Sequence, residues 1–131
     1  LSEISFKDDF SIYGPGVIGV TELTFTSGGS IQQAKVYLND ENYQFKSSPG
    51  LYSSGEVYLG DVVTHELGHL LGLSHSEILE ATMFYAAFPG QSTLSSDDKA
   101  GVKSKYGSSY GTITGTVRGG DDVGILGVHV V

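Results

Sequence analysis

The stretch HELGHLLGLSH, at positions 65–75, constrains this chain most, because it holds three of the four histidines. His65 and His69 are four positions apart, which on an α-helix places their side chains about 40° apart around the axis and about 6 Å apart along it. Two imidazoles in that relation can converge on one ion at the roughly 2.0–2.1 Å of zinc–nitrogen bonds. The stretch therefore predicts a helix that presents two metal ligands on one face.

The third histidine requires a change of backbone direction. If the helix continued, His75 would lie about 9 Å beyond His69 and about 240° around the axis, out of reach of the same ion. Gly72 stands between them, and glycine adopts a positive φ at little cost. We therefore expect the helix to stop at Gly72 and the chain to turn back. Three neutral nitrogens leave one tetrahedral position open, as in catalytic zinc sites, and Glu66 is placed to accept a proton from metal-bound water.

Composition narrows the classes of partner and of site. The formal net charge of −8, from 15 acidic and 7 basic residues, disfavours nucleic acid and anionic membrane as partners. The chain has no cysteine, which excludes disulfides and thiolate ligands. No apolar run approaches the roughly 18 residues of a membrane span, and no signal peptide is visible. Because the chain begins with Leu1, we expect that an upstream segment has been removed.

Hydrophobic periodicity and turn residues outline the elements. Alternation predicts strands at 4–10, 20–26 and 31–39, with glycine-rich turns at 14–19 and 27–30. A long polar loop follows, with a short strand at 43–45. Helical spacing starts at Tyr58, where Asp61 either caps the helix or lies in its first turn. After a loop at 74–94, a second helix begins at Ser95 or Ser96 and ends at Gly107. Residues 108–131 read as a separate β segment with a hairpin turn.

Several motifs together resemble one family. HELGHLLGLSH is similar to the extended zinc motif of the metzincin metalloendopeptidases, and ATMFY supplies Met83 for the turn that packs beneath the metal in that group. Ser76 after the third histidine resembles the matrixins, the matrix-metalloproteinase group. LSSDDKAGVKSKYG is similar to the matrixins' closing helix, and GPGVIGV, at 14–20, to the approach to the strand above their cleft.

The resemblance implies an α+β fold for residues 1–107. We expect a twisted, mostly parallel sheet with an antiparallel edge strand, a zinc-site helix and a C-terminal helix, followed by a short β segment. ISFKDD resembles the end of the matrixins' first region, which indicates that their N-terminal strand and first helix are absent here. GTITGTV and GILGVHVV, within 108–131, resemble the opening strands of a carboxypeptidase-regulatory-like accessory domain.

The resemblance also implies a function, that of a zinc-dependent endopeptidase with one catalytic Zn²⁺ held by His65, His69 and His75. A protein or peptide substrate would lie extended near Ile18 and Gly19, with one side chain in a pocket walled by residues 84–88. Tyr85 either lines that wall, the reading we favour, or touches the zinc as a tyrosine does in astacins and serralysins. We expect a secreted or extracellular monomer, or in a bacterium one in the periplasm or on the cell surface.

Departures from the matrixins keep alternatives open. Their second, structural zinc should be absent, since the only remaining histidine is His129. Ca²⁺ cannot be assigned: Asn39, Asp40 and Glu41 are loose candidates, and a solvated loop is the favoured reading. An incomplete domain could hold zinc and bind peptides without turnover, although Glu66 argues against this. The third hypothesis is a metal-free, acidic, β-rich adhesion or scaffold fragment.

Overall fold

The computed structural model describes residues 3–107, which have a mixed α and β architecture. The β segment expected at 108–131 lies outside the described residues. Neither helix within 3–107 has the length and apolar character needed to cross a bilayer. In chain order the elements are β1 (Glu3–Lys7), the 3₁₀ turn η1 (Ser11–Tyr13), β2 (Gly19–Phe25), β3 (Ile31–Asn39), β4 (Gln44–Lys46), β5 (Glu56–Tyr58), α1 (Leu59–Leu70) and α2 (Ser96–Tyr106).

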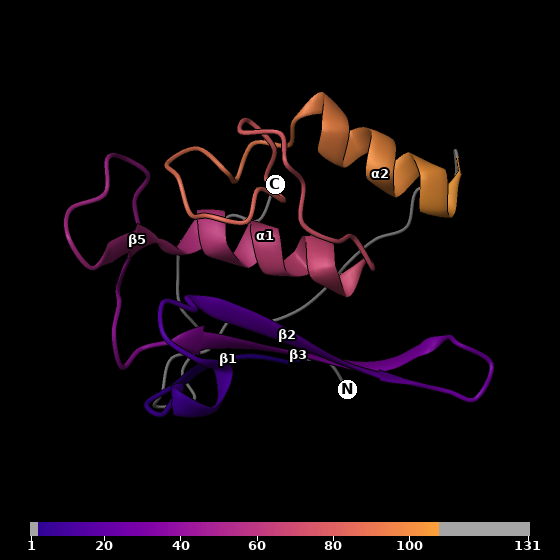
Figure 1. Ribbon diagram of the computed structural model, residues 1–131, viewed down its shortest axis with the longest axis horizontal. Coiled ribbons are helices and arrows are strands. Elements are labelled where there is room, and N and C mark those ends of the chain that lie inside the picture. Colours follow the sequence, from indigo (N-terminus) through magenta and orange to yellow (C-terminus); the bar gives the residue numbers. More distant parts are fainter. Residues whose placement is uncertain (1–2, 108–131) are drawn as a thin grey trace.

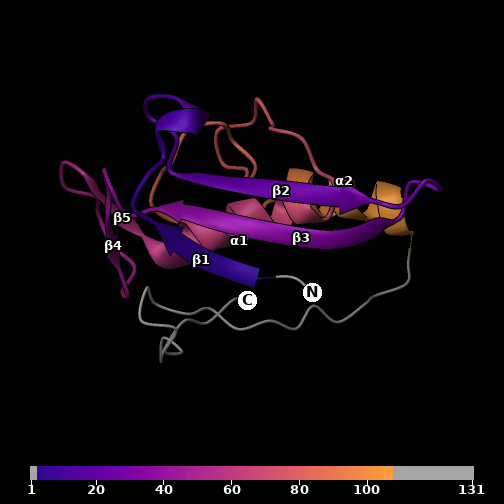
Figure 2. The ribbon, with the colours of Figure 1, turned by 90° about the horizontal axis from the view of Figure 1, so that it is seen from below.

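The main sheet has the order β1-β3-β2, so β2 lies at an edge. β1 runs parallel to β3, and β2 runs antiparallel to it, with Gly19 opposite Leu38 and Leu23 opposite Ala34. The second sheet, β4-β5, is also parallel. The predicted sheet, mostly parallel with an antiparallel edge strand, is therefore confirmed. Figure 2 shows β2 as the outer strand, whose second edge pairs with no other described strand.

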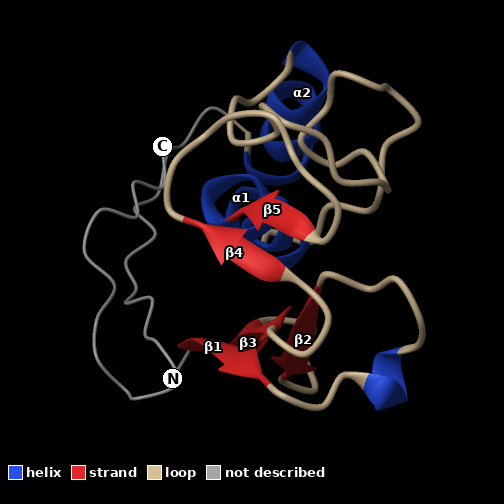
Figure 3. Ribbon diagram, turned by 90° about the vertical axis from the view of Figure 1, so that its left-hand side faces the viewer, coloured by secondary structure: helices blue, strands red, loops and turns tan. Residues whose placement is uncertain are grey.

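The core lies between this sheet and α1. Ala34, Val36 and Leu38 alternate along β3 and so share one face of it, and all three are buried. Val36 and Leu38 pack with Val62 and Val63 of α1, because the period-2 apolar face of the strand meets the period-3.6 apolar stripe of the helix. Figures 1 and 3 show the resulting layers: the sheet, then α1 across one face, then α2 on the far side of α1.

The first strand and the polar loop differ from expectation. β1 ends at Lys7, whereas we expected a strand through Phe10; the Phe10 ring is instead buried beyond the sheet, and its N–H donates to the Glu41 carboxylate at 3.0 Å. The short strand expected at 43–45 is observed as Gln44–Lys46, and it pairs with β5, which we did not expect. Strands of three residues are too short for alternation to identify, and only their pairing defines them.

The second helix begins and ends as its sequence indicates. The Ser95 hydroxyl accepts from the Asp97 and Asp98 N–H groups, and the Asp98 side chain accepts from the Ser95 N–H, which is a reciprocal capping box. Gly107, the expected stop, follows the last helical residue with φ of 69°. This cap has a second role, because the same Asp98 carboxylate also accepts hydrogen bonds from the turn that contains Met83.

Candidate metal centre and cleft

The three histidines of the motif meet in space. His65 and His69 project from α1, and His75 comes from the following loop; their candidate ligand atoms all lie within 4.8 Å of one another. The Nε2 atoms of His69 and His75 are 3.2 Å apart. No other group of three or more His, Asp or Glu side chains within residues 3–107 is spaced to hold a metal ion. The predicted convergence is thus observed.

The turn that returns His75 is a helix C-cap built on glycine. Gly72 has φ of 80°, and its N–H donates to the His69 carbonyl at 2.8 Å. The Leu73 N–H donates to the Gly68 carbonyl at 3.0 Å, which completes a Schellman motif. The helix therefore ends at Leu70, one residue after its second histidine, and the chain folds back toward the first two imidazoles.

Backbone carbonyls orient two of the three rings. The Nδ1 atom of His65 lies 2.8 Å from the Thr82 carbonyl oxygen, and Nδ1 of His69 lies 2.9 Å from the Leu73 carbonyl oxygen. A carbonyl only accepts, so each Nδ1 carries the proton and each Nε2 keeps a lone pair. This is the arrangement that fixes the tautomer of metal-binding histidines. Every residue has a backbone carbonyl, so the sequence does not indicate which carbonyl a histidine will contact, and these two acceptors were not predicted.

Burial keeps the imidazoles in the form that can bind a metal. Burial lowers the pKa of His65 to about 4, and the neighbouring His69 and His75 rings add to the decrease while the Thr82 carbonyl opposes it. Burial also lowers the pKa of His75, with a smaller contribution from His69. Near neutral pH these two rings are uncharged. These two donors are therefore neutral nitrogens, and a set of imidazole nitrogens suits zinc and related transition metals.

Glu66 is buried between α1 and the edge strand, with 4% of its surface exposed. The Thr21 hydroxyl on β2 lies 2.7 Å from its Oε2, and a Cβ built at Gly19 would lie 2.8 Å from its Oε1. Burial raises the pKa of Glu66, while the hydrogen bond from Thr21 opposes that increase. A carboxylate with a raised pKa beside a metal site is suited to proton transfer near neutral pH.

The turn that contains Met83 lies directly beneath α1. Met83 is 3% exposed, and its sulfur occupies the space that a side chain at Gly68 would need. The buried Asp98 carboxylate accepts from the Thr82 N–H at 2.9 Å and the Met83 N–H at 3.1 Å. Burial alone would raise the pKa of Asp98, but the hydrogen bonds from Thr82, Ser95 and Met83 outweigh it and hold that pKa below its usual value. The cap of α2 thus positions the residue whose carbonyl orients His65.

A cleft of about 820 Å³ runs past the imidazoles. Its lining includes both predicted substrate-binding positions on the edge strand, Ile18 and Gly19, together with His65, Glu66 and Tyr85. Tyr85 is 69% exposed, and its ring lies against that of Phe84, with 4.4 Å between centroids. The edge strand, the metal-site helix and the 84–87 segment therefore enclose one continuous hollow.

Two buried polar side chains hold the far wall of this cleft. The Asp61 carboxylate accepts from the Tyr52 hydroxyl at 2.6 Å and from the N–H groups of Gly90 and Ser92. Asp61 lies in the first turn of α1, which is one of the two positions we expected for it. Its carboxylate accepts from N–H groups of the neighbouring loop and does not cap the helix. The Gln91 amide donates to the Ala86 carbonyl at 2.9 Å and accepts from the Phe88 N–H at 2.7 Å. Sequence analysis missed both roles.

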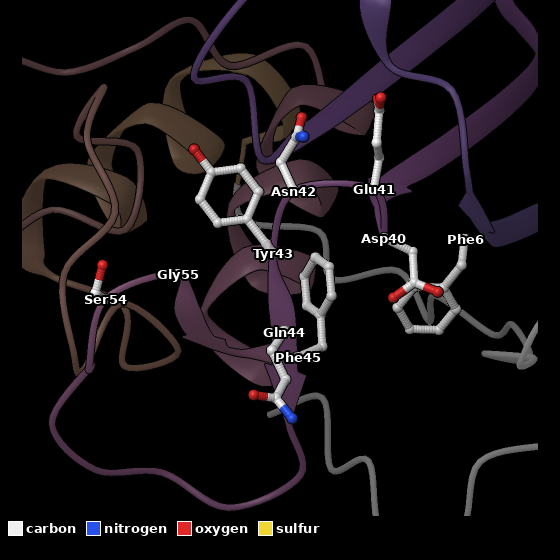
Figure 4. Close-up of a pocket in the computed structure, with 9 residues that line it drawn as sticks. All are labelled: Phe6, Asp40, Glu41, Asn42, Tyr43, Gln44, Phe45, Ser54 and Gly55. Atoms are coloured by element: carbon white, nitrogen blue, oxygen red, sulfur yellow. The ribbon is translucent and has the colours of Figure 1, made fainter.

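A second hollow of about 670 Å³ lies beside β4 and contains the loose Ca²⁺ candidates Asp40 and Glu41. Figure 4 shows the Glu41 side chain directed away from the Asp40 carboxylate. Glu41 accepts from the Phe10 N–H, and Asn39 is buried, donating to the Val17 carbonyl at 2.7 Å. Glu41 Oε2 and the Asn39 amide thus have protein partners, and among residues 3–107 no group of three Asp, Glu or His side chains other than the three histidines is spaced to hold a cation.

Comparison with known proteins agrees with the site geometry. The matrixin family model matches residues 6–107. The chain is 34% identical over 96 residues to Metalloendoproteinase 4-MMP of Arabidopsis thaliana, covering 72% of this chain and 27% of that protein. It is 37% identical over 98 residues to Matrix metalloproteinase-27 of Homo sapiens (72% and 18%), and 43% identical over 60 residues to the Hatching enzyme of Paracentrotus lividus (44% and 10%). The chain spans only 10% to 27% of the length of these relatives. Because the family match extends over most of the chain, this protein belongs to the matrixin family.

Proposed function

We propose that residues 3–107 form the catalytic part of a zinc-dependent endopeptidase. One observation carries this proposal: three imidazoles converge beside a buried carboxylate in a cleft that follows an open strand edge. Family membership supports the same reaction class. The chain covers a minor part of its relatives' length, so the activity of the whole protein is part of the proposal.

His65, His69 and His75 would hold the zinc ion through their Nε2 atoms or, for the unanchored His75, through either ring nitrogen. The carbonyl oxygens of Thr82 and Leu73 fix two of the rings, so little ordering is needed on binding. When bound, zinc supplies a Lewis acid that lowers the pKa of water toward 7 and polarises a peptide carbonyl. Met83 would serve as the packed floor of the site and not as a ligand.

Glu66 would act as the general base. Its carboxylate takes a proton from the attacking water and later delivers it to the nitrogen of the leaving amine. Its burial supports this role, because a raised pKa brings the carboxylate closer to the proton affinity of the groups with which it exchanges.

A peptide substrate would bind in an extended conformation along the free edge of β2. The Ile18 carbonyl already accepts from the Asn39 N–H at 2.9 Å, so main-chain pairing near Ile18 and Gly19 would use the backbone groups on the other edge of β2, from Gly19 onward, which is the mode of β-strand addition. One apolar substrate side chain would enter the hollow bounded by residues 84–88, with Tyr85 as part of the wall. The exposure of Tyr85 and its contact with Phe84 favour the wall over a zinc contact. The expected monomeric state and extracellular location stay predictions.

Cleavage of an unfolded protein substrate tests the proposal. We expect the zinc-loaded wild type to cleave it and Glu66→Ala to be at least about 10²-fold slower. Glu3→Ala, which alters an exposed carboxylate on β1, is the matched control and should match the wild type. Metal analysis should find one zinc per chain in all three proteins. Equal cleavage by wild type and Glu66→Ala would refute the role of Glu66, and tight peptide binding without product would favour a binding module instead.

A further inference from the structure

We propose that Thr21 is a positioning residue that holds the Glu66 carboxylate in its working orientation, an inference that rests on the proposed function. Thr21 lies on the strand expected to bind the substrate backbone, whereas Glu66 lies on the metal-site helix, 45 residues further along the chain. No motif connects the two. The contact would make one strand responsible for placing both the peptide and the base.

The geometry is that of a charge-assisted hydrogen bond. Thr21 Oγ1 lies 2.7 Å from Glu66 Oε2 and 2.9 Å from the Glu66 backbone carbonyl. A hydroxyl has one proton to donate, and a carboxylate is the stronger acceptor of the two. The side chain of Thr21 has two heavy atoms on Cβ, which restricts its χ1 rotamer and holds the hydroxyl toward the helix.

The strand restrains Glu66 from a second direction. Gly19 is two residues before Thr21 and therefore faces the same side of β2. A Cβ at Gly19 would lie 2.8 Å from Glu66 Oε1 and 3.1 Å from its carboxyl carbon, so the carboxylate occupies the space that a side chain would fill. Its two oxygens are thus bounded, one by the bare backbone of Gly19 and the other by the hydroxyl of Thr21.

Pairing with β3 makes this restraint rigid. Gly19 lies opposite Leu38 and Thr21 opposite Val36, and both partners are buried core residues. A shift of β2 by one residue would turn Thr21 away from α1 and expose the apolar face of the strand. Thr21, which holds Glu66, and the backbone that would pair with the peptide belong to the same strand. The strand β2 therefore fixes the distance between Glu66 and a bound peptide. Misplacement of a reacting group by about 1 Å can reduce a rate by about 10²-fold.

Three variants separate positioning from a structural role. Thr21→Val keeps the shape and removes the hydroxyl; we expect kcat to fall by about 10- to 100-fold with KM within about twofold, because the change leaves the backbone of β2, which would pair with the peptide, unaltered. Thr21→Ser restores a hydroxyl and should recover most of kcat. Thr24→Val removes an exposed hydroxyl from the opposite face of β2 and should leave kcat unchanged. Zinc content should be equal in all of them.

A readout without turnover tests the contact itself. The decrease in urea midpoint caused by Thr21→Val should be at least twofold smaller in a Glu66→Ala background, since the carboxylate partner is already gone. An active wild type together with an unchanged kcat in Thr21→Val would overturn the inference alone. Equal midpoint shifts in the two backgrounds would also overturn it. An inactive zinc-loaded wild type would remove the proposed function, and the inference with it.

Discussion

The close approach of Gly68 to Met83 predicts the result of a single methyl insertion. Gly68→Ala adds a Cβ that overlaps the Met83 sulfur and lies 3.1 Å from its Cε. Met83 is 3% exposed, so its side chain cannot swing into solvent. Overpacking of this kind costs about 1–3 kcal/mol, whereas alanine in a helix interior is favoured over glycine by about 0.5–1 kcal/mol. We therefore expect Gly68→Ala to lower the free energy of unfolding by about 1–2 kcal/mol.

The same change should have the opposite sign once the sulfur is removed. Met83→Ala alone should cost about 2–5 kcal/mol through the cavity it leaves. In that background Gly68→Ala meets no overlap, and it should stabilise the protein by up to about 1 kcal/mol. The coupling between the two sites is then about 1–3 kcal/mol, the cost of the overlap itself.

Urea unfolding at one fixed zinc concentration measures this cycle, with stabilities obtained by linear extrapolation. Ala100→Gly, at an exposed position of α2, is the control, because it reports the helix preference alone in the same protein. Gly68→Ala should also weaken zinc binding, because displacement of the turn moves the Thr82 carbonyl that orients His65. If Gly68→Ala had the same effect on stability with and without Met83, the packing argument would be wrong.

Three further predictions concern charge and metal. Asp98→Asn should cost about 1.5–3 kcal/mol at pH 7 in urea unfolding, because hydrogen bonds from three N–H groups lose their charged acceptor; an unchanged midpoint would contradict this. In the metal-free protein, burial holds the pKa of His65 near 4, so between pH 6.5 and 4 the unfolded state takes up a proton that the folded state refuses. Stability present above pH 6.5 should then be lost as the pH falls, by at most about 3 kcal/mol from His65. His65→Gln should show a smaller loss, because in both proteins His75, whose pKa burial also lowers, acts in the same sense and Glu66, whose pKa burial raises, acts in the opposite sense. Zinc at about 100 times its dissociation constant should add about 2.7 kcal/mol and a chelator should remove it, as measured by the unfolding free energy; a chelator without effect would contradict the metal site.

The sequence alone was sufficient for features whose cause is local. The four-residue spacing of His65 and His69 and the glycine at 72 predicted two ligands, a helix end and a returning third ligand, and the structure brings the rings together. A serine at 95 or 96 followed by Asp97 and Asp98 predicted the start of α2, and Ser95 is the N-cap. The alternation in β3 placed Ala34, Val36 and Leu38 on one buried face, although Tyr37 and Asn39 of the other face are buried as well. Each of these depends on backbone geometry within a few residues, and residue type reports such geometry directly.

Only the tertiary structure decided how these pieces support one another. Thr21 and Glu66 are 45 residues apart, Asp61 and Ser92 are 31, and Asp98 and Thr82 are 16. In the last two pairs the partner is a backbone N–H group, which every residue except proline has, so no sequence pattern indicates the contact. β4 and β5 are likewise defined by their pairing. Periodicity shows which side of a strand or helix is apolar; which buried acceptor meets which distant donor is settled when the strand packs on the helix and water is excluded from both.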